Sequence, residues 1–241
     1  MWHKTVGKIF LITVGILFIA TTVIFTIFFV YYLWQVKYGG IENIEKLSEK
    51  FSPQFTAHTN LENTIPKIVE NQSAYIHPHN PAKGEENAPI TILAFIDFQC
   101  QYCQQAYTFL EDITTRYNPV VKVVFKYLPL IDNGDDIFAA PLAAACAHEQ
   151  NRFWEYHNII FQSKQFNIES LRTVAIQIGL DINTFDKCVS SKKYQQNIKQ
   201  DMLDAVDIGI RGTPTYIVNG EIVEGIIGLD IWNNLILEHL K

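Results

Sequence analysis

Two cysteines separated by two residues, Cys100 and Cys103, follow a short apolar segment and open a helical pattern. The apolar segment, Ile90 to Ile96, lacks strict alternation, which is typical of a strand covered on both faces. At a helix start, unpaired N–H groups and the helix dipole stabilise a thiolate at Cys100, whereas Cys103 lies one turn further in. The pattern therefore predicts an exposed, attacking sulfur at Cys100 and a buried, resolving sulfur at Cys103.

The N-terminal part of the chain contains a long uncharged segment, residues 9–36, which is rich in Ile, Phe, Val and Leu. It is long enough to cross a hydrocarbon core of about 30 Å. We expect a transmembrane signal anchor, because the segment ends in aromatic residues and not in the small residues of a cleavage site. Cleavage is the alternative. Lys4 and Lys8 predict a cytoplasmic N-terminus, residues 1–8, and an inner-membrane, single-pass protein whose remaining chain is periplasmic or otherwise extracytoplasmic.

The charge and the cysteine count restrict the class of protein further. The formal net charge is −6, and every acidic residue follows the uncharged segment, so the sequence gives no support to nucleic-acid binding. An extracytoplasmic compartment permits disulfides, and the number of cysteines, four, is even. Cys146 and Cys188 both fall in a helical region, where we favour a structural disulfide. Two free buried thiols are the alternative.

The rest of the chain predicts a spacer followed by a folded domain. Residues 37–75 are polar with scattered apolar positions, which indicates a spacer, with a dimerisation arm of a homodimer as the alternative. Residues 76–241 hold the domain. Its strand at 90–96, a helix after Cys103 and a second strand at 120–127 predict a parallel pair with a right-handed crossover.

A large helical region and a terminal hairpin complete the domain. Residues 134–209 read as helices almost throughout. Thr215 to Val218 and Glu221 to Glu224 predict a hairpin with the two-residue turn Asn219-Gly220. Asp230 is placed to cap a last helix. The predicted fold is therefore α/β, with a mixed sheet and a helical insert at about 134–209.

Three motifs together resemble a known family. Residues 97–103, Asp-Phe-Gln-Cys-Gln-Tyr-Cys, follow a strand; residues 146–150, Cys-Ala-His-Glu-Gln, lie in the helical insert with Phe153-Trp154; and residues 212–215 read Gly-Thr-Pro-Thr. In this order they resemble the DsbA-like branch of the thioredoxin superfamily, over roughly residues 76–241. The resemblance implies a thioredoxin-like fold and thiol–disulfide exchange without a cofactor or a bound metal.

The resemblance also implies roles for individual residues. Cys100 and Cys103 are the catalytic pair, and Pro214 follows a cis bond that turns the backbone of Thr213 toward them. Thr213 and Pro214, with Gln101 and Tyr102 between the cysteines, are then the expected substrate-binding residues. A substrate thiolate attacks Cys100, and the mixed disulfide is resolved by exchange.

The sequence departs from the best-known oxidases of this family at two places. They carry Pro-His between the cysteines, so Gln101-Tyr102 removes an imidazole that stabilises the thiolate. Ala94 stands where related enzymes often keep a buried acid. Asp97 is a candidate to replace this acid as the proton acceptor for Cys103. The alternative is that Asp97 only caps the helix from the end of the strand. Lys126 is expected to be exposed at a strand end, with neutralisation of Asp97 as the alternative.

The leading hypothesis is a membrane-anchored protein disulfide oxidoreductase that forms disulfides in exported cysteine-containing polypeptides. The resemblance implies recycling by a quinone-linked membrane partner. A disulfide isomerase or reductase is the alternative, and Thr213 also occurs in such relatives. A thioredoxin-like copper metallochaperone is a further alternative, although those relatives space their cysteines one residue further apart.

Overall fold

The computed structural model describes residues 15, 19–31, 68–130 and 136–241. It separates into two compact units, Met1–Phe51 and Ser52–Lys241. In the first unit, residues 19–31 are helical with exposed side chains, and the Thr26 hydroxyl donates to the carbonyl oxygen of Thr22. None of the helices formed by the described residues combines the length and the apolar character that spanning a bilayer requires.

The predicted anchor at 9–36 and the predicted spacer at 37–75 lie partly outside the described residues, and both stay predictions. The first residues of the predicted helical insert, 134 and 135, also fall outside them. The described helices of this insert begin with α4 (Ala139–Glu149).

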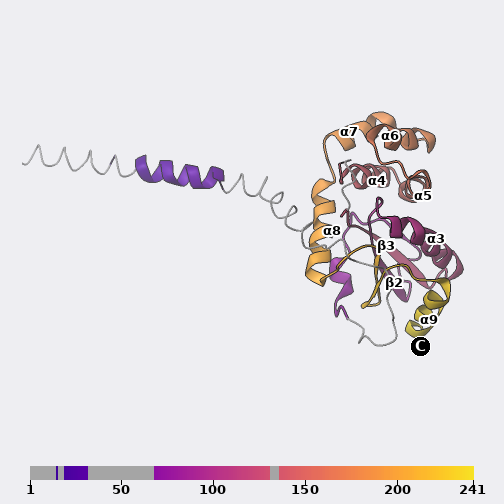
Figure 1. Cartoon of the computed structure of the whole chain (residues 1–241). Coiled ribbons are helices and arrows are strands. Elements are labelled where there is room, and N and C mark those ends of the chain that lie inside the picture. The colour runs from indigo at the N-terminus through magenta and orange to yellow at the C-terminus, as the bar shows by residue number, and fades with distance from the viewer. Residues whose placement is uncertain (1–14, 16–18, 32–67, 131–135) are drawn as a thin grey trace, which may run out of the picture. The chain divides into compact units, whose positions relative to one another are not determined.

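Five strands of the described chain form a mixed sheet in the second unit (Figure 1), in the order β1-β3-β2-β4-β5. β2 and β3 are parallel, as predicted, and β4 pairs antiparallel with β2. The central strands are almost entirely buried, which is why their sequences do not alternate. The strands are β1 (Ala82–Lys83), β2 (Ile90–Ile96), β3 (Val121–Tyr127), β4 (Thr215–Val218) and β5 (Glu221–Glu224).

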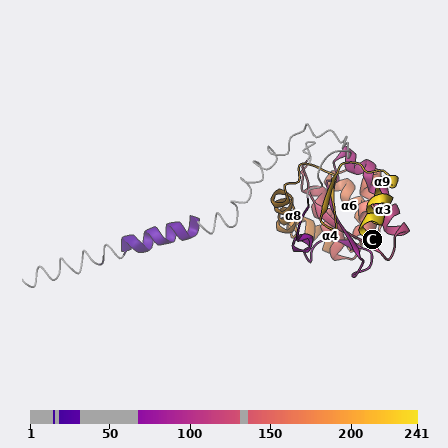
Figure 2. The same cartoon turned by 90° about the horizontal axis from the view of Figure 1, so that it is seen from below.

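Helices cover both faces of this sheet, as two perpendicular views show (Figure 1 and Figure 2). The helices α3 and α9 lie on one face, where the Trp232 ring packs on Tyr216 of β4 with 5.0 Å between centroids. The helix α8 lies on the other face, and α4 to α7 form the insert between β3 and α8. The bounds are α3 (Gln101–Arg116), α5 (Phe153–Ser163), α6 (Ile168–Gln177), α7 (Ile182–Ser190), α8 (Gln195–Ile208) and α9 (Leu229–His239), with a short 3-10 helix at Gln72–Tyr75.

The C-terminal elements follow the sequence prediction with one difference. Asn219 and Gly220 both have positive φ, 45° and 97°, so the predicted primed hairpin turn is confirmed. Asp230 does not cap the last helix, because α9 begins one residue earlier, with Gly228 at its N-cap. Asp230 instead lies in the first turn, where its negative charge is favourable to the helix dipole.

Cys146 of α4 and Cys188 of α7 are joined by a disulfide, the pairing that the sequence favoured. The bond closes a loop with a sequence separation of 42 residues. Such a loop constrains the unfolded chain by about 4 kcal/mol in the loop-entropy description. It therefore holds two helices of the insert together independently of their packing.

The chain enters the sheet beside the β4–β5 hairpin. The Val69 N–H donates to the Gly220 carbonyl oxygen at 2.8 Å. The Gln72 side chain donates from Nε2 to the Thr91 carbonyl oxygen and accepts at Oε1 from the Gly220 N–H. A Cβ at Gly220 would lie 2.8 Å from the carbonyl oxygen of Val69, so this close approach requires glycine. Because Thr91 lies at the start of β2 and Cys100 beyond its end, the entry point and the thiols lie at opposite ends of this strand.

Lys126 of β3 is completely buried, in contrast to the prediction of an exposed lysine. Its Nζ lies 2.6 Å from Asp201 Oδ1 and 2.7 Å from Asp204 Oδ2, both on α8. The alternative pairing with Asp97 is also wrong. The Lys126 ammonium group is bound by the two carboxylates of α8, whereas the carboxylate of Asp97, beyond the end of β2, accepts backbone N–H groups.

Two half-buried histidines contact the carboxylates of this cluster. His77 Nε2 lies 2.7 Å from Asp204, and His79 Nε2 lies 3.0 Å from Asp201, with the two rings stacked 5.3 Å apart. Burial raises the pKa of Asp204, but hydrogen bonds from Lys126 and other donors outweigh it, so this pKa is lowered overall. The cluster therefore joins the segment before β1 to both β3 and α8.

We expect Lys126→Met to lower the free energy of unfolding by about 3–5 kcal/mol, because it leaves buried carboxylates without a counter-ion. Urea unfolding followed by circular dichroism measures this loss. Lys122→Met is the matched control, because Lys122 lies on the same strand and pairs with the exposed Glu86. Its expected loss is below about 1 kcal/mol. Equal losses in the two variants would contradict the structural importance of the buried cluster.

Candidate active site

Cys100 occupies the N-cap of α3, and Cys103 lies in its first turn. The Gln104 N–H donates to the Cys100 carbonyl oxygen at 3.0 Å, so the helical hydrogen bonds begin at Cys100. The pair thus stands at the end of β2, at the start of a helix, as the sequence predicted. The unpaired N–H groups there favour a thiolate.

The loop before β4 lies against Cys100. The Thr213–Pro214 peptide bond is cis, as the resemblance implied. Thr215 begins β4 and is paired with Phe95, which places this loop beside the turn that follows β2. In the thiol form, Cys100 Sγ donates to the carbonyl oxygen of Thr213 at 3.3 Å. The tertiary fold thereby brings the two expected motifs into direct contact.

The two thiols differ strongly in pKa. The pKa of Cys100 is lowered to about 6, chiefly by a hydrogen bond with Cys103 and further by the Thr213 side chain and backbone N–H groups, which together outweigh the opposing effect of burial. Burial raises the pKa of Cys103 well above its usual value, and the neighbouring Cys100 and Asp97 charges add to this. At neutral pH, Cys100 is therefore mostly thiolate while Cys103 keeps its proton.

The prediction of an exposed Cys100 is wrong. Only 4% of Cys100 is exposed, against 1% of Cys103 and 6% of Thr213. The reason is tertiary, because the cis-proline loop lies over the sulfur and leaves little of the residue uncovered. Between the cysteines, Gln101 is exposed and Tyr102 is 37% exposed. These two side chains are the accessible part of the motif.

Asp97 is buried, with 2% exposure, and its carboxylate is held by backbone N–H groups. Oδ1 accepts from Gln99 N and Oδ2 accepts from Leu130 N, each at 2.9 Å. It does not cap α3, whose N-cap is Cys100, but organises the turn before it. Its charge still acts on the pKa of Cys103. Sequence reasoning missed Leu130, because nothing in its pattern marks a backbone N–H as the partner of a distant carboxylate.

A group of three potential metal ligands lies in the described part of the chain, away from the redox motif. One ligand atom from each of His77, Asp201 and Asp204 lies within 4.8 Å of the others. The ammonium group of Lys126 already contacts both carboxylates. The positive charge of Lys126 already balances these two carboxylates, so the three residues do not fit an additional cation.

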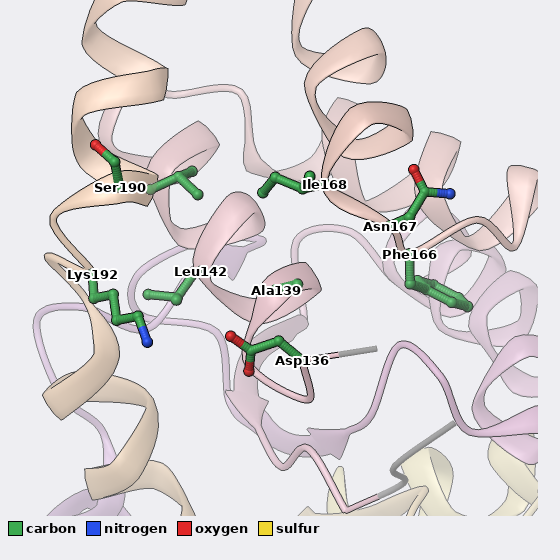
Figure 3. Close-up of a pocket in the computed structure, with 9 residues that line it drawn as sticks. Asp136, Ala139, Leu142, Phe166, Asn167, Ile168, Ser190 and Lys192 are labelled. Carbon is green, nitrogen blue, oxygen red and sulfur yellow. The ribbon is translucent and has the colours of Figure 1, made fainter. Parts of the chain in front are cut away.

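A cavity of about 510 Å³ lies in the helical insert (Figure 3). Leu142, Phe166 and Ile168 give it an apolar lining, with Asp136 and Lys192 as charged residues in its wall. None of its lining residues belongs to the two redox motifs. The cavity is therefore separate from the site of the thiols.

The comparison with protein families agrees with this geometry. Residues 77–238 match the family model described as thioredoxin. The chain belongs to the thioredoxin family. The predicted thioredoxin-like sheet with helices is confirmed. In this thioredoxin-family protein, Cys100 and Cys103 occupy the strand–helix junction described above.

Solved structures share the fold of this thioredoxin-family chain. A thioredoxin-like oxidoreductase from Silicibacter pomeroyi DSS-3 is 22% identical, with a TM-score of 0.63, and the match covers 70% of this chain and 97% of that one. The thiol-disulfide exchange protein α-DsbA2 from Wolbachia pipientis is 20% identical, with a TM-score of 0.62, and the match covers 70% and 91%. At these identities the likeness establishes the fold.

Curated relatives match over a shorter part of their own length. The Na(+)/H(+) antiporter NhaA 3 of Salinispora tropica is 33% identical over 140 residues, which are 57% of this chain and 21% of that protein. The chain thus spans about a fifth of the length of the curated relatives it matches.

We expect Thr213→Val to raise the pKa of Cys100, because the Thr213 side chain is one of the groups that lower it. The thiolate absorbance near 240 nm, titrated with pH in a Cys103→Ala background and compared with that background alone, measures this shift. Thr215→Val is the matched control. Its hydroxyl donates to the Gly212 carbonyl oxygen at 2.7 Å, so no change in the Cys100 pKa is expected. An unchanged pKa in Thr213→Val would contradict this role of the Thr213 side chain.

Proposed function

We propose that this protein is a membrane-anchored, extracytoplasmic thiol:disulfide oxidase that forms disulfides in exported polypeptides. The observation that carries the proposal is the geometry of the two thiols at one helix start, with Cys100 at the N-cap of α3 against the Thr213 carbonyl oxygen and Cys103 buried in the first turn. This geometry lowers the pKa of Cys100 to about 6 and raises that of Cys103. A thiolate stabilised in the reduced enzyme makes the disulfide form a stronger oxidant.

The reaction proceeds by two exchanges at sulfur. A substrate thiolate attacks Cys100 Sγ of the oxidised enzyme, the Cys100–Cys103 bond breaks, and Cys103 leaves with the electron pair and takes up a proton. A second substrate thiolate then attacks the substrate sulfur of the mixed disulfide. Cys100 leaves as a thiolate, which its low pKa favours. The substrate loses two electrons and gains a disulfide, and the enzyme becomes a dithiol.

The environment of each sulfur supports this order of events. Cys103 is 1% exposed and keeps its proton at neutral pH, so it is poorly placed for an encounter with a polypeptide. Cys100 contacts Thr213, whose backbone lies at the loop where an extended substrate is expected to bind. Gln101 and Tyr102 are accessible beside it. We therefore assign the mixed disulfide to Cys100.

The cellular setting of the proposal rests on the sequence. The uncharged residues 9–36 support an anchor, and Lys4 and Lys8 support a cytoplasmic N-terminus with the catalytic domain outside. The Cys146–Cys188 disulfide is consistent with an oxidising compartment.

A quinone-linked membrane protein is proposed as the partner that reoxidises the dithiol. A homodimer formed through residues 37–75 is tested by sedimentation of the full chain in detergent.

In Cys103→Ala, the Cys100 thiolate is expected to attack a disulfide of an exported polypeptide, release one of its sulfurs as a thiolate and stay joined to the other, because Cys103 is absent and cannot displace the polypeptide in return. The complexes are measured by non-reducing gel electrophoresis and mass spectrometry after acid quenching. The Cys100→Ala, Cys103→Ala double variant is the matched control and should trap nothing. If Cys103→Ala also traps nothing, the proposal of polypeptide exchange at Cys100 fails.

The direction of exchange is decided by the reduction potential of the Cys100–Cys103 pair. Equilibration of the full chain with glutathione buffers, followed by thiol labelling, is expected to give a value nearer about −120 mV than about −270 mV, the ends represented by a strong oxidase and by thioredoxin. A value near the lower end would contradict the oxidase and favour the reductase alternative. The isomerase alternative is tested with a second enzyme whose disulfides have been scrambled. Recovery of that enzyme's activity in the presence of this protein would favour an isomerase.

A further inference from the structure

Asp97 connects two loops at the active-site end of the sheet. Its Oδ1 accepts from the N–H of Gln99, the residue that immediately precedes Cys100. Its Oδ2 accepts from the N–H of Leu130, in the segment that follows β3. Asp97 is only 2% exposed, so a polypeptide bound at Cys100 has little of it to contact. Any effect of Asp97 on substrate recognition has to act through the residues that it holds.

The bridge continues the sheet where the strands end. Leu128 N donates to the Ile96 carbonyl oxygen at 2.9 Å and so extends the pairing of β3 with β2. Two residues later, the carboxylate of Asp97 accepts the backbone N–H of Leu130. Leu130 therefore lies beside the turn that leads into Cys100. It is half-buried, unlike the fully buried Leu128, so part of its side chain is accessible.

We propose that Asp97 is a positioning residue for substrate recognition. It holds Leu130 beside the catalytic turn, residues 97–100, so that the Leu130 side chain contacts an apolar residue next to the substrate cysteine. This inference rests on the proposed exchange with polypeptides. A carboxylate suits the role because both oxygens accept hydrogen bonds. An asparagine would turn an amide group, which is a donor, toward one of the two backbone N–H groups.

The test measures a preference between two peptides. Each carries two cysteines, and they differ only in Leu or Ser next to the first cysteine. The oxidised full chain is assayed with both, and the readout is the ratio of kcat/KM for the Leu peptide to that for the Ser peptide. A change at the thiols alone slows both peptides alike and cancels in this ratio, whereas loss of an apolar contact lowers it.

We expect Asp97→Asn and Leu130→Ala each to lower this ratio about five-fold, the scale of one partly buried apolar contact. Because Asp97 acts through Leu130, the double variant should lower it no further than the larger single effect. Asp136→Asn is the matched control. Its carboxylate accepts from Phe138 N, two residues away, and does not bridge two loops, so its ratio should match that of the unmodified protein.

Several outcomes would overturn the inference. An unchanged ratio in Asp97→Asn, or an equal slowing of both peptides, would assign Asp97 to the thiol chemistry or to stability alone. Additive effects in the double variant would show that Asp97 does not act through Leu130. Leu130→Ala keeps the backbone bridge, so an unchanged ratio there overturns the inference even if Asp97→Asn fails to fold. If the unmodified protein oxidises neither peptide, the proposed function itself fails.

Discussion

The antiparallel pairing of β4 with β2 is the contact on which the active site depends. Thr215 lies opposite Phe95, and this register brings the loop of Thr213 and Pro214 to the end of β2, where Cys100 begins the next helix. A shift of this pairing by one residue would reverse the faces of β4 and move the loop away from the sulfur. The buried Tyr216–Trp232 contact on one face of β4 opposes such a shift.

Burial and hydrogen bonding act in opposite directions at the two thiols, and their balance creates the redox asymmetry. Both cysteines are buried, and burial alone would raise both pKa values. At Cys100, hydrogen bonds with Cys103, with Thr213 and with the backbone outweigh burial, whereas at Cys103 the neighbouring negative charges add to it. Thiolate character thus depends on donors more than on exposure, and a nearly covered sulfur still carries the lower pKa.

The buried cluster around Lys126 stabilises the face of the sheet that α8 covers, opposite the face covered by α3 and α9. It joins β3 to Asp201 and Asp204 of α8, and through His77 and His79 it joins the segment before β1. That segment reaches the sheet at the β4–β5 turn, at the end of β2 away from the thiols. The catalytic turn and the point of chain entry are therefore held apart by the length of the sheet.

The sequence by itself determined the local elements and the place of the cysteine pair at a strand–helix junction. Residues 90–96, the cysteine pair and the Asn219-Gly220 turn each carry their signal within a few neighbouring residues, because periodicity and turn chemistry are local. The cover over Cys100, the burial of Lys126 and the partners of Asp97 were decided by the tertiary structure. Each depends on residues far apart in the chain meeting in one register, and no local pattern encodes which backbone N–H or carboxylate will lie opposite a given side chain.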